Sequence, residues 1–214
     1  MTRVELKKLS KQQLKGNWAT CAVVMLIYFA ITGFFTYLSA GITSIMNKNV
    51  PISVGLGIVG IIGTILVGGF IAYGLARFFM TLVRTGETQI ENLISGFKIF
   101  GKVLGLYIMM AIFVYLWTLL FVVPGIIAIY RYRMAYYILI DNPDMGIMEA
   151  ISESKKMMDG HKGELFVLDW SFILWEILGM LTLGIGMLWV SSYMFTTEVN
   201  YYEYLRGSAT VKTA

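Results

Sequence analysis

The stretch ATCAVVMLIYFAITGFFTYLS, residues Ala19–Ser39, contains no charged side chain. A helix needs about 20 apolar residues to cross the hydrocarbon core of a bilayer, so this stretch predicts a transmembrane helix. The whole chain of 214 residues shares this character, with 57% hydrophobic and 14% charged residues. Soluble domains carry about a quarter charged residues. The sequence therefore predicts a membrane protein with little chain left for a soluble domain.

Five further apolar runs follow, at about residues 54–80, 103–123, 126–140, 164–181 and 187–204. We interpret Pro124–Gly125 as a tight turn, because one helix from 103 to 140 would be far too long for a hydrocarbon core of about 30 Å. We therefore predict an all-α fold, a polytopic membrane bundle of six transmembrane helices arranged as three hairpins. Residues 1–18 then form a basic segment, 19–206 the membrane domain and 207–214 a tail.

Basic residues are distributed asymmetrically about these runs. Of the 17 Lys and Arg residues, only Lys48 lies on one side, in the polar loop at residues 40–53. Short loops rich in Lys and Arg stay in the cytoplasm, so the pattern predicts a multi-pass cell-membrane protein with both termini cytoplasmic. We expect the partners of these residues to be the anionic headgroups of membrane lipids, and not nucleic acid.

Two cytoplasmic segments have the spacing of amphipathic helices, which we expect to lie at the inner membrane interface. Their apolar residues are Ile90, Leu93, Ile94 and Phe97 in the first segment, and Ile147, Ala150, Ile151 and Met158 in the second. Tyrosines gather toward the inner ends of the runs at 126–140 and 187–204: Tyr130, Tyr132, Tyr136, Tyr137, Tyr201, Tyr202 and Tyr204. We interpret them as an aromatic belt at headgroup level, with stacking on a substrate as the alternative.

Charged residues inside the predicted spans are the main candidates for a functional site. Arg131 and Arg133 lie on the fourth span, Asp169 and Glu176 on the fifth and Glu198 on the sixth. Asp169 and Glu176 are seven residues apart, so their carboxylates face the same way on a helix. The arginines are two residues apart, so at most one should face the acidic seam, while the other snorkels toward the inner interface or meets Glu198.

These charges have three interpretations. They can be structural ion pairs that hold the last three spans together, since charges within a membrane normally pair or line a wet cavity. An arginine in an inward-facing cavity can bind a phosphate or carboxylate bidentately. A carboxylate such as Glu176, desolvated near the middle of the membrane, can carry a proton.

Small residues recur at every fourth position in the second run, at Gly60, Thr64, Gly68, Ala72 and Ala76. Such a stripe lets another helix approach closely, which is how helices associate in lipid. We expect it to be a packing surface, either within the bundle, in a homo-oligomer or against a partner membrane protein.

The sequence gives no indication of catalysis or of a cofactor. His161 is the single histidine and has no second His or Cys nearby, so we predict no metal site. Motifs for phosphate loops, dinucleotide binding, zinc proteases and nucleophile elbows do not occur. We therefore predict that the protein is not an enzyme.

Seven short motifs together resemble a known family. They are Glu5-Leu6-Lys7, Leu14–Trp18, Pro124-Gly125-Ile126, Tyr132–Leu139, Asp141-Asn142-Pro143, Ser154–Lys162 and Leu168–Ile173. In combination they are similar to the bacterial integral membrane family catalogued as domain of unknown function 975. That family in turn looks distantly similar to the membrane domain found beside some glycerophosphodiester phosphodiesterases. The resemblance implies a membrane bundle and a link to lipids or the cell envelope, without a defined activity.

Our leading hypothesis is a protein that binds or moves a lipid or anionic amphiphile in an inward-facing cleft between the last three spans. Arg131 would be the anion contact, with Asp169 and Glu176 as its counter-charges. Two alternatives remain open. The bundle can be a scaffold or accessory subunit that binds a partner through the small-residue stripe, or a proton-coupled transporter of small molecules.

Overall fold

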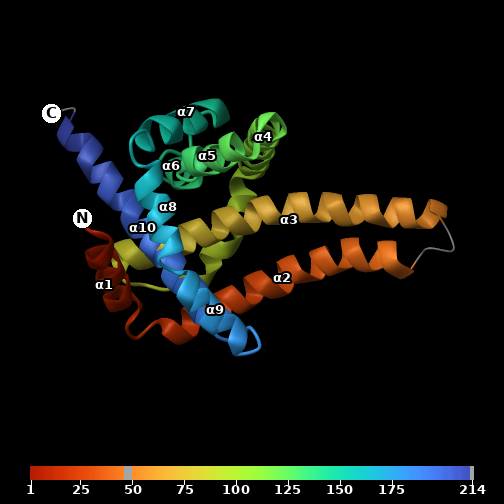
Figure 1. Cartoon of the computed structure of the whole chain (residues 1–214), viewed down its shortest axis with the longest axis horizontal. Coiled ribbons are helices and arrows are strands. Elements are labelled where there is room, and N and C mark those ends of the chain that lie inside the picture. Colours follow the sequence, from red (N-terminus) through yellow and green to blue (C-terminus); the bar gives the residue numbers. More distant parts are fainter. Residues whose placement is uncertain (46–49, 213–214) are drawn as a thin grey trace.

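The computed structural model describes the backbone of residues 1–45 and 50–212 and the side-chain surroundings of residues 1–37, 60 and 63–207. Every element in these ranges is helical (Figure 1). The helices are α1 (Arg3–Leu14), α2 (Trp18–Ile45), α3 (Val50–Thr85), the 3₁₀-helix η1 (Ile90–Ile99), α4 (Phe100–Leu120), α5 (Val122–Tyr132), α6 (Ala135–Asp141), α7 (Ile147–Met157), α8 (Lys162–Trp170), α9 (Ile173–Leu181) and α10 (Met187–Lys212).

Three of the described helical stretches are long and apolar enough to cross a membrane: Trp18–Tyr37, Gly63–Thr85 and Ile90–Leu120. The first two belong to α2 and α3, which lie side by side as a long hairpin (Figure 1). The third joins η1 to α4. They overlap the first three predicted spans, although the third begins at Ile90, within the segment that we predicted to be cytoplasmic. Lys48, the basic residue that we predicted on the outer side, lies outside the described residues.

The helices at the next two predicted spans differ from the expectation. The run at 126–140 is divided between α5 and α6 at Arg133–Met134, and the run at 164–181 between α8 and α9 at Ser171–Phe172. The longest of these four pieces, α5, has 11 residues and is about 17 Å long, too short to cross alone. Neither break contains Gly or Pro, so tertiary packing overrides helix propensity there. The six-span topology stays a prediction.

The turn between α4 and α5 lies at Phe121, earlier than the predicted turn at Pro124–Gly125. Pro124 instead occupies the first turn of α5, where a missing backbone N–H does no harm. Gly125 packs directly on Thr118 of α4, whose Cα would be 2.9 Å from a Cβ at position 125. This pair therefore permits a close hairpin and does not form its turn.

The core joins both ends of the chain. Helix α1 packs against α10 through Leu6 and Leu14, both buried, and the Asn200 amide of α10 donates to Ser10 Oγ at 3.0 Å and to Gln13 Oε1 at 2.6 Å. The N-terminal basic segment is thus part of the folded bundle. A second core cluster, around Tyr73, lies between α3, α4, α5, α6 and α7.

The predicted interfacial helix at 90–97 forms as η1 and lies against α3. The Asn92 amide donates to Thr81 Oγ1 at 2.9 Å, and the backbone of Leu93 packs against Gly74, which is buried. Ile94 and Phe97 stay largely exposed. Because η1 also belongs to the stretch Ile90–Leu120, which is apolar enough to cross a membrane, its position at the interface stays a prediction. Close contact at Gly74 therefore sets the distance between η1 and α3.

Gly74→Ala should destabilise the protein by roughly 1–3 kcal/mol, because the new Cβ meets the backbone of Leu93, which cannot rotate away. Gly33→Ala is the matched control, since its Cβ would meet nothing within 4 Å on α2 and alanine has the higher helix propensity. The midpoint of thermal unfolding in detergent measures both. Equal midpoints for the two variants would contradict the close approach of η1 and α3.

Candidate functional site

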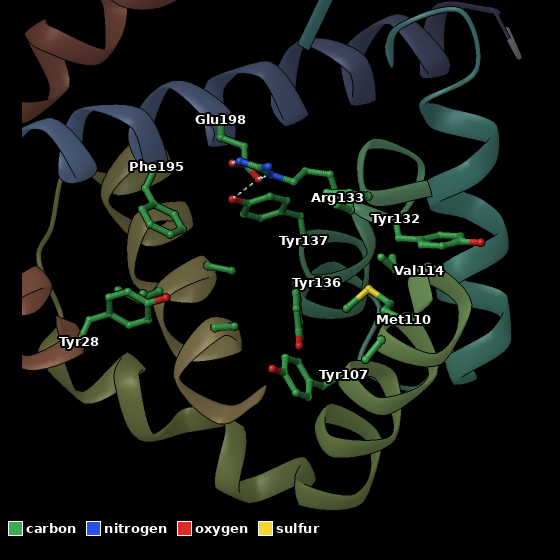
Figure 2. A pocket seen from close by; sticks show the side chains of 15 residues that line it. Tyr28, Tyr107, Met110, Val114, Tyr132, Arg133, Tyr136, Tyr137, Phe195 and Glu198 are labelled. Atoms are coloured by element: carbon green, nitrogen blue, oxygen red, sulfur yellow. Dashed lines mark hydrogen bonds and ion pairs between the residues drawn. The ribbon is translucent and has the colours of Figure 1, made fainter. Parts of the chain in front are cut away.

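A cavity of about 390 Å³, cavity A, lies between α3, α4, α5, α6 and α10, with Tyr28 of α2 at one side (Figure 2). Its volume is within the range of small-molecule sites in proteins. The lining is mostly aliphatic and aromatic. It consists of Tyr28, Ala72, Leu75, Ala76, Tyr107, Met110, Ala111, Val114, Ile129, Tyr132, Arg133, Tyr136, Tyr137, Phe195 and Glu198.

One wall of cavity A is an ion pair between Arg133, at the end of α5, and Glu198 of α10. Arg133 donates from Nε to Oε1 at 3.0 Å and from Nη2 to Oε2 at 2.8 Å, and the Tyr137 hydroxyl donates to Oε1 at 3.3 Å. Behind this pair, Asp169 of α8 lies 3.7 Å from Arg133 Nη1 and accepts a hydrogen bond from the Tyr130 hydroxyl at 3.0 Å. Three segments far apart in sequence thus meet at one guanidinium.

The structure assigns the two arginines differently from our expectation. Arg133, and not Arg131, receives the carboxylates of Asp169 and Glu198. Arg131 lies outside the lining of cavity A, and its buried Nε has no hydrogen-bond partner among the described residues. Glu176 on α9 also lies outside the lining. The predicted arrangement, with Asp169 and Glu176 as counter-charges of Arg131, is therefore replaced by an Arg133-centred cluster.

The small-residue stripe on α3 faces the inside of the described bundle for much of its length. Ala72 and Ala76 line cavity A, and a Cβ at Gly68 would lie 3.3 Å from the Tyr107 hydroxyl of α4. Thr64 donates its hydroxyl to the carbonyl of Gly60 within α3. The small residues therefore let Tyr107 approach α3 and leave room for cavity A. A bulky residue at Gly68 would clash with Tyr107 of α4, whether or not a partner protein binds.

Two further cavities adjoin cavity A. Cavity B, of about 200 Å³, shares Tyr28, Ala72 and Tyr107 with cavity A. Cavity C, of about 690 Å³, shares Tyr28, Phe35 and Val67 with cavity B and lies between α2, α3 and η1. Apart from Glu91 its lining is apolar or aromatic: Val24, Ile27, Tyr28, Ile31, Phe35, Leu66, Val67, Phe70, Ile71, Ile90, Leu93, Ile94, Phe97 and Phe100.

Several tyrosines that we interpreted as a headgroup belt lie inside the protein. Tyr132, Tyr136 and Tyr137 line cavity A, and Tyr107 and Tyr28, which the sequence analysis did not single out, join them (Figure 2). The Tyr136 hydroxyl is buried and has no hydrogen-bond partner among the described residues. The clustering of tyrosines in the sequence was a usable signal for this site, but clustering alone does not separate a belt from a cavity wall.

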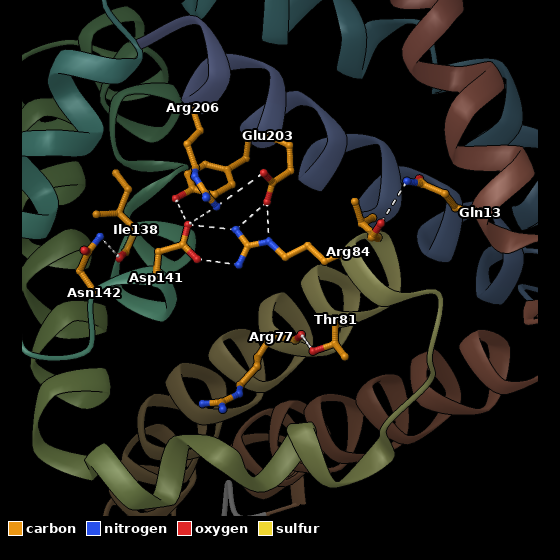
Figure 3. Close-up of polar contacts among 11 residues, drawn as sticks. Gln13, Arg77, Thr81, Arg84, Ile138, Asp141, Asn142, Glu203 and Arg206 are labelled. Carbon is orange, nitrogen blue, oxygen red and sulfur yellow. Dashed lines mark hydrogen bonds and ion pairs between the residues drawn. The ribbon is translucent and has the colours of Figure 1, made fainter. Parts of the chain in front are cut away.

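A second charged cluster, also missed in the sequence, joins α3, α6 and α10 (Figure 3). Arg84 donates to both oxygens of Asp141, at 2.7 and 2.9 Å, and from Nε to Glu203 Oε1 at 2.7 Å. Asp141 also accepts from the Tyr202 hydroxyl at 2.7 Å and from Arg206 at 3.1 Å. Partial burial acts to raise the pKa of Asp141, but these hydrogen bonds and the two cationic charges outweigh it and hold the pKa below its usual range.

This cluster predicts a pH-dependent stability. Since the folded-state pKa of Asp141 is lowered, its ionised form stabilises the fold above the ordinary pKa of 3.8, and the stabilisation is lost as the pH falls through the lower folded-state value. Asp141→Asn should cost about 1 kcal/mol at pH 7, where solvent screens the partly exposed arginines, and progressively less below pH 3.8. Unfolding midpoints between pH 3 and 7 measure this. Exposed Asp144→Asn is the control, and a pH-independent difference for Asp141→Asn would contradict the assignment.

Comparison with known proteins gives one family. The model of a family described as "Protein of unknown function (DUF975)" matches residues 1–130 and 119–209. No curated protein matches the chain. No solved structure matches it. The predicted similarity to the phosphodiesterase-associated membrane domain stays a prediction. The family match extends over nearly the whole chain, and the protein belongs to the DUF975 family.

Proposed function

We propose that this protein binds an amphiphile, such as a membrane lipid, along the row of adjoining cavities A, B and C. The observation that supports the proposal is that the lining residues change from partly charged to apolar along this row of cavities. Cavity A has a charged wall at Arg133 and Glu198, whereas cavity C is lined almost wholly by apolar side chains. A molecule with a polar head and an apolar tail matches both ends.

The polar end offers directional contacts as well as charge. The Tyr136 hydroxyl needs a hydrogen-bond partner, because an unpaired buried polar group costs about 1–3 kcal/mol. Tyr107 and Tyr28 bring two more hydroxyl-bearing side chains to the wall that cavities A and B share. A ligand head with hydroxyl or ester oxygens would satisfy such donors.

The apolar end accommodates a hydrocarbon chain. Cavity C lies between α2 and α3, two helices that can each span a membrane, and η1, whose Ile94 and Phe97 are largely exposed. A lipid tail in the bilayer could therefore enter sideways, without crossing a polar layer. Binding in the cell membrane, with or without transfer between leaflets, is the role that we propose, and it requires no catalytic step.

We expected an anionic head bound by Arg131. Because Arg131 lies outside the lining of cavity A, the proposal keeps the amphiphile and moves its head to the wall formed by Arg133 and Glu198. Scaffolding through the stripe on α3 is the weaker candidate. The inner residues of that stripe already pack within the chain.

Ala72→Leu should lower the amount of lipid that stays bound by about tenfold, because the added side chain projects into the wall shared by cavities A and B and overpacking there costs roughly 1–3 kcal/mol. Native mass spectrometry of the gently extracted protein measures retained lipid per chain. Ala30→Leu, an exposed change on α2 outside all three linings, is the matched control.

Two results would speak against the amphiphile. One is a wild-type protein that retains no lipid at all. The other is retention that is equal in Ala72→Leu and Ala30→Leu while both variants unfold at the wild-type temperature.

A further inference from the structure

The charged cluster at one wall of cavity A contains more carboxylates than cations: Arg133 and Glu198 line the cavity, and Asp169 lies outside the lining, 3.7 Å from Arg133 Nη1. Arg133 is the one cation in contact with Glu198 and Asp169 among the described residues, so the group carries a net charge of one negative unit when all three are ionised. Uncompensated charge in surroundings of low dielectric constant costs several kcal/mol. The wall therefore favours a ligand that supplies positive charge.

The other basic residues on packed elements do not pair with these carboxylates. Arg131 of α5 lies outside the lining of cavity A and makes no ion pair with Glu198 or Asp169 in the part of the chain that the structure describes. Lys7 of α1 donates to the carbonyl of Ser171 and lies 3.9 Å from the ring centroid of Phe172. Lys155 of α7 lies 5.7 Å from the ring centroid of Tyr132. Neither is ion-paired with Glu198 or Asp169 in the described part of the chain. Glu176 on α9 lies outside the lining of cavity A and supplies no positive charge.

Aromatic side chains make up much of the remaining lining of cavity A. Five lining residues have rings around the open space, namely Tyr28, Tyr107, Tyr136, Tyr137 and Phe195, whereas the ring of Tyr132 points away from it and packs with Phe113 (Figure 2). Aromatic faces are electron-rich and attract cations, and walls of several rings are how proteins recognise quaternary ammonium groups. Excess negative charge and aromatic walls favour the same kind of head.

We propose that cavity A takes the head of a cationic amphiphile, an alkylammonium group held by aromatic rings beside Glu198, with Asp169 adding its negative charge from outside the lining. The inference rests on the proposed function and specifies the ligand class of the same site. A bound proton would balance the charge but would make no use of the rings. An anionic head would add to the negative charge of the wall.

Three amphiphiles with the same tetradecyl chain test the inference: one with a trimethylammonium head, one with a sulfate head and one with an uncharged glucoside head. Binding to the full-length protein in uncharged maltoside detergent is measured by equilibrium dialysis at fixed ionic strength. The ammonium compound should bind roughly tenfold more tightly than the other two, the scale of a desolvated cation–π contact with one added charge.

Asp169→Asn should remove most of this preference, because it neutralises the carboxylate behind Arg133 without breaking the bidentate pair with Glu198. Exposed Asp144→Asn is the matched control and should keep the preference. Glu198→Gln, which releases Arg133, should shift the preference toward the sulfate head.

The outcomes separate the two proposals. Equal binding of the three heads, or tighter binding of the sulfate, overturns the inference and leaves the amphiphile site standing. Binding of none of them, together with no retained lipid in native mass spectrometry, overturns the proposed function as well. A preference for ammonium that Asp169→Asn does not change also overturns the inference.

Discussion

The bidentate pair between Arg133 and Glu198 is the contact on which the second half of the fold depends. A guanidinium among apolar helices needs its charge and its donors satisfied, and Glu198 does both with two short hydrogen bonds. The pair fixes α10 against the junction of α5 and α6, and Asp169 brings α8 to the same place. The helix break at Arg133–Met134 then lies where the backbone must turn to keep the guanidinium at this meeting point.

Helix α10 links this pair to the second charged cluster. Glu198 and Tyr202 are four residues apart, so they lie on one face, and the ring of Tyr202 stacks on that of Tyr137 with centroids 5.3 Å apart. Tyr137 donates to Glu198, while Tyr202 donates to Asp141, which Arg84 holds. Hydrogen bonds and one ring stack thus connect cavity A with the end of α6 at Asp141. A change at one cluster has a short and continuous path to the other.

The sequence predicts the first half of the fold better than the second, for a physical reason. Residues 19–39 and 54–80 are long apolar runs, and hydropathy alone makes each a helix that can span a membrane. The runs at 126–140 and 164–181 are shorter and carry several charged residues, and their helix breaks depend on tertiary contacts that no local pattern contains. The site follows the same rule. The sequence pattern identifies Arg133, Asp169 and Glu198 among the candidate residues, but it cannot decide whether Arg131 or Arg133 turns toward the two carboxylates.

The existence of cavity A is itself informative. Helices in membranes associate chiefly through close packing, and an empty space forfeits the dispersion contacts of its lining. The small side chains of Ala72 and Ala76 leave space beside α3, in a chain that is rich in large apolar residues. The rings of Tyr107 and Tyr136 do not fill that space. Larger side chains at the two alanines would close the space and restore these contacts. The space instead lies next to the Arg133–Glu198 ion pair and a Tyr136 hydroxyl that has no partner among the described residues, and this combination supports the proposed ligand.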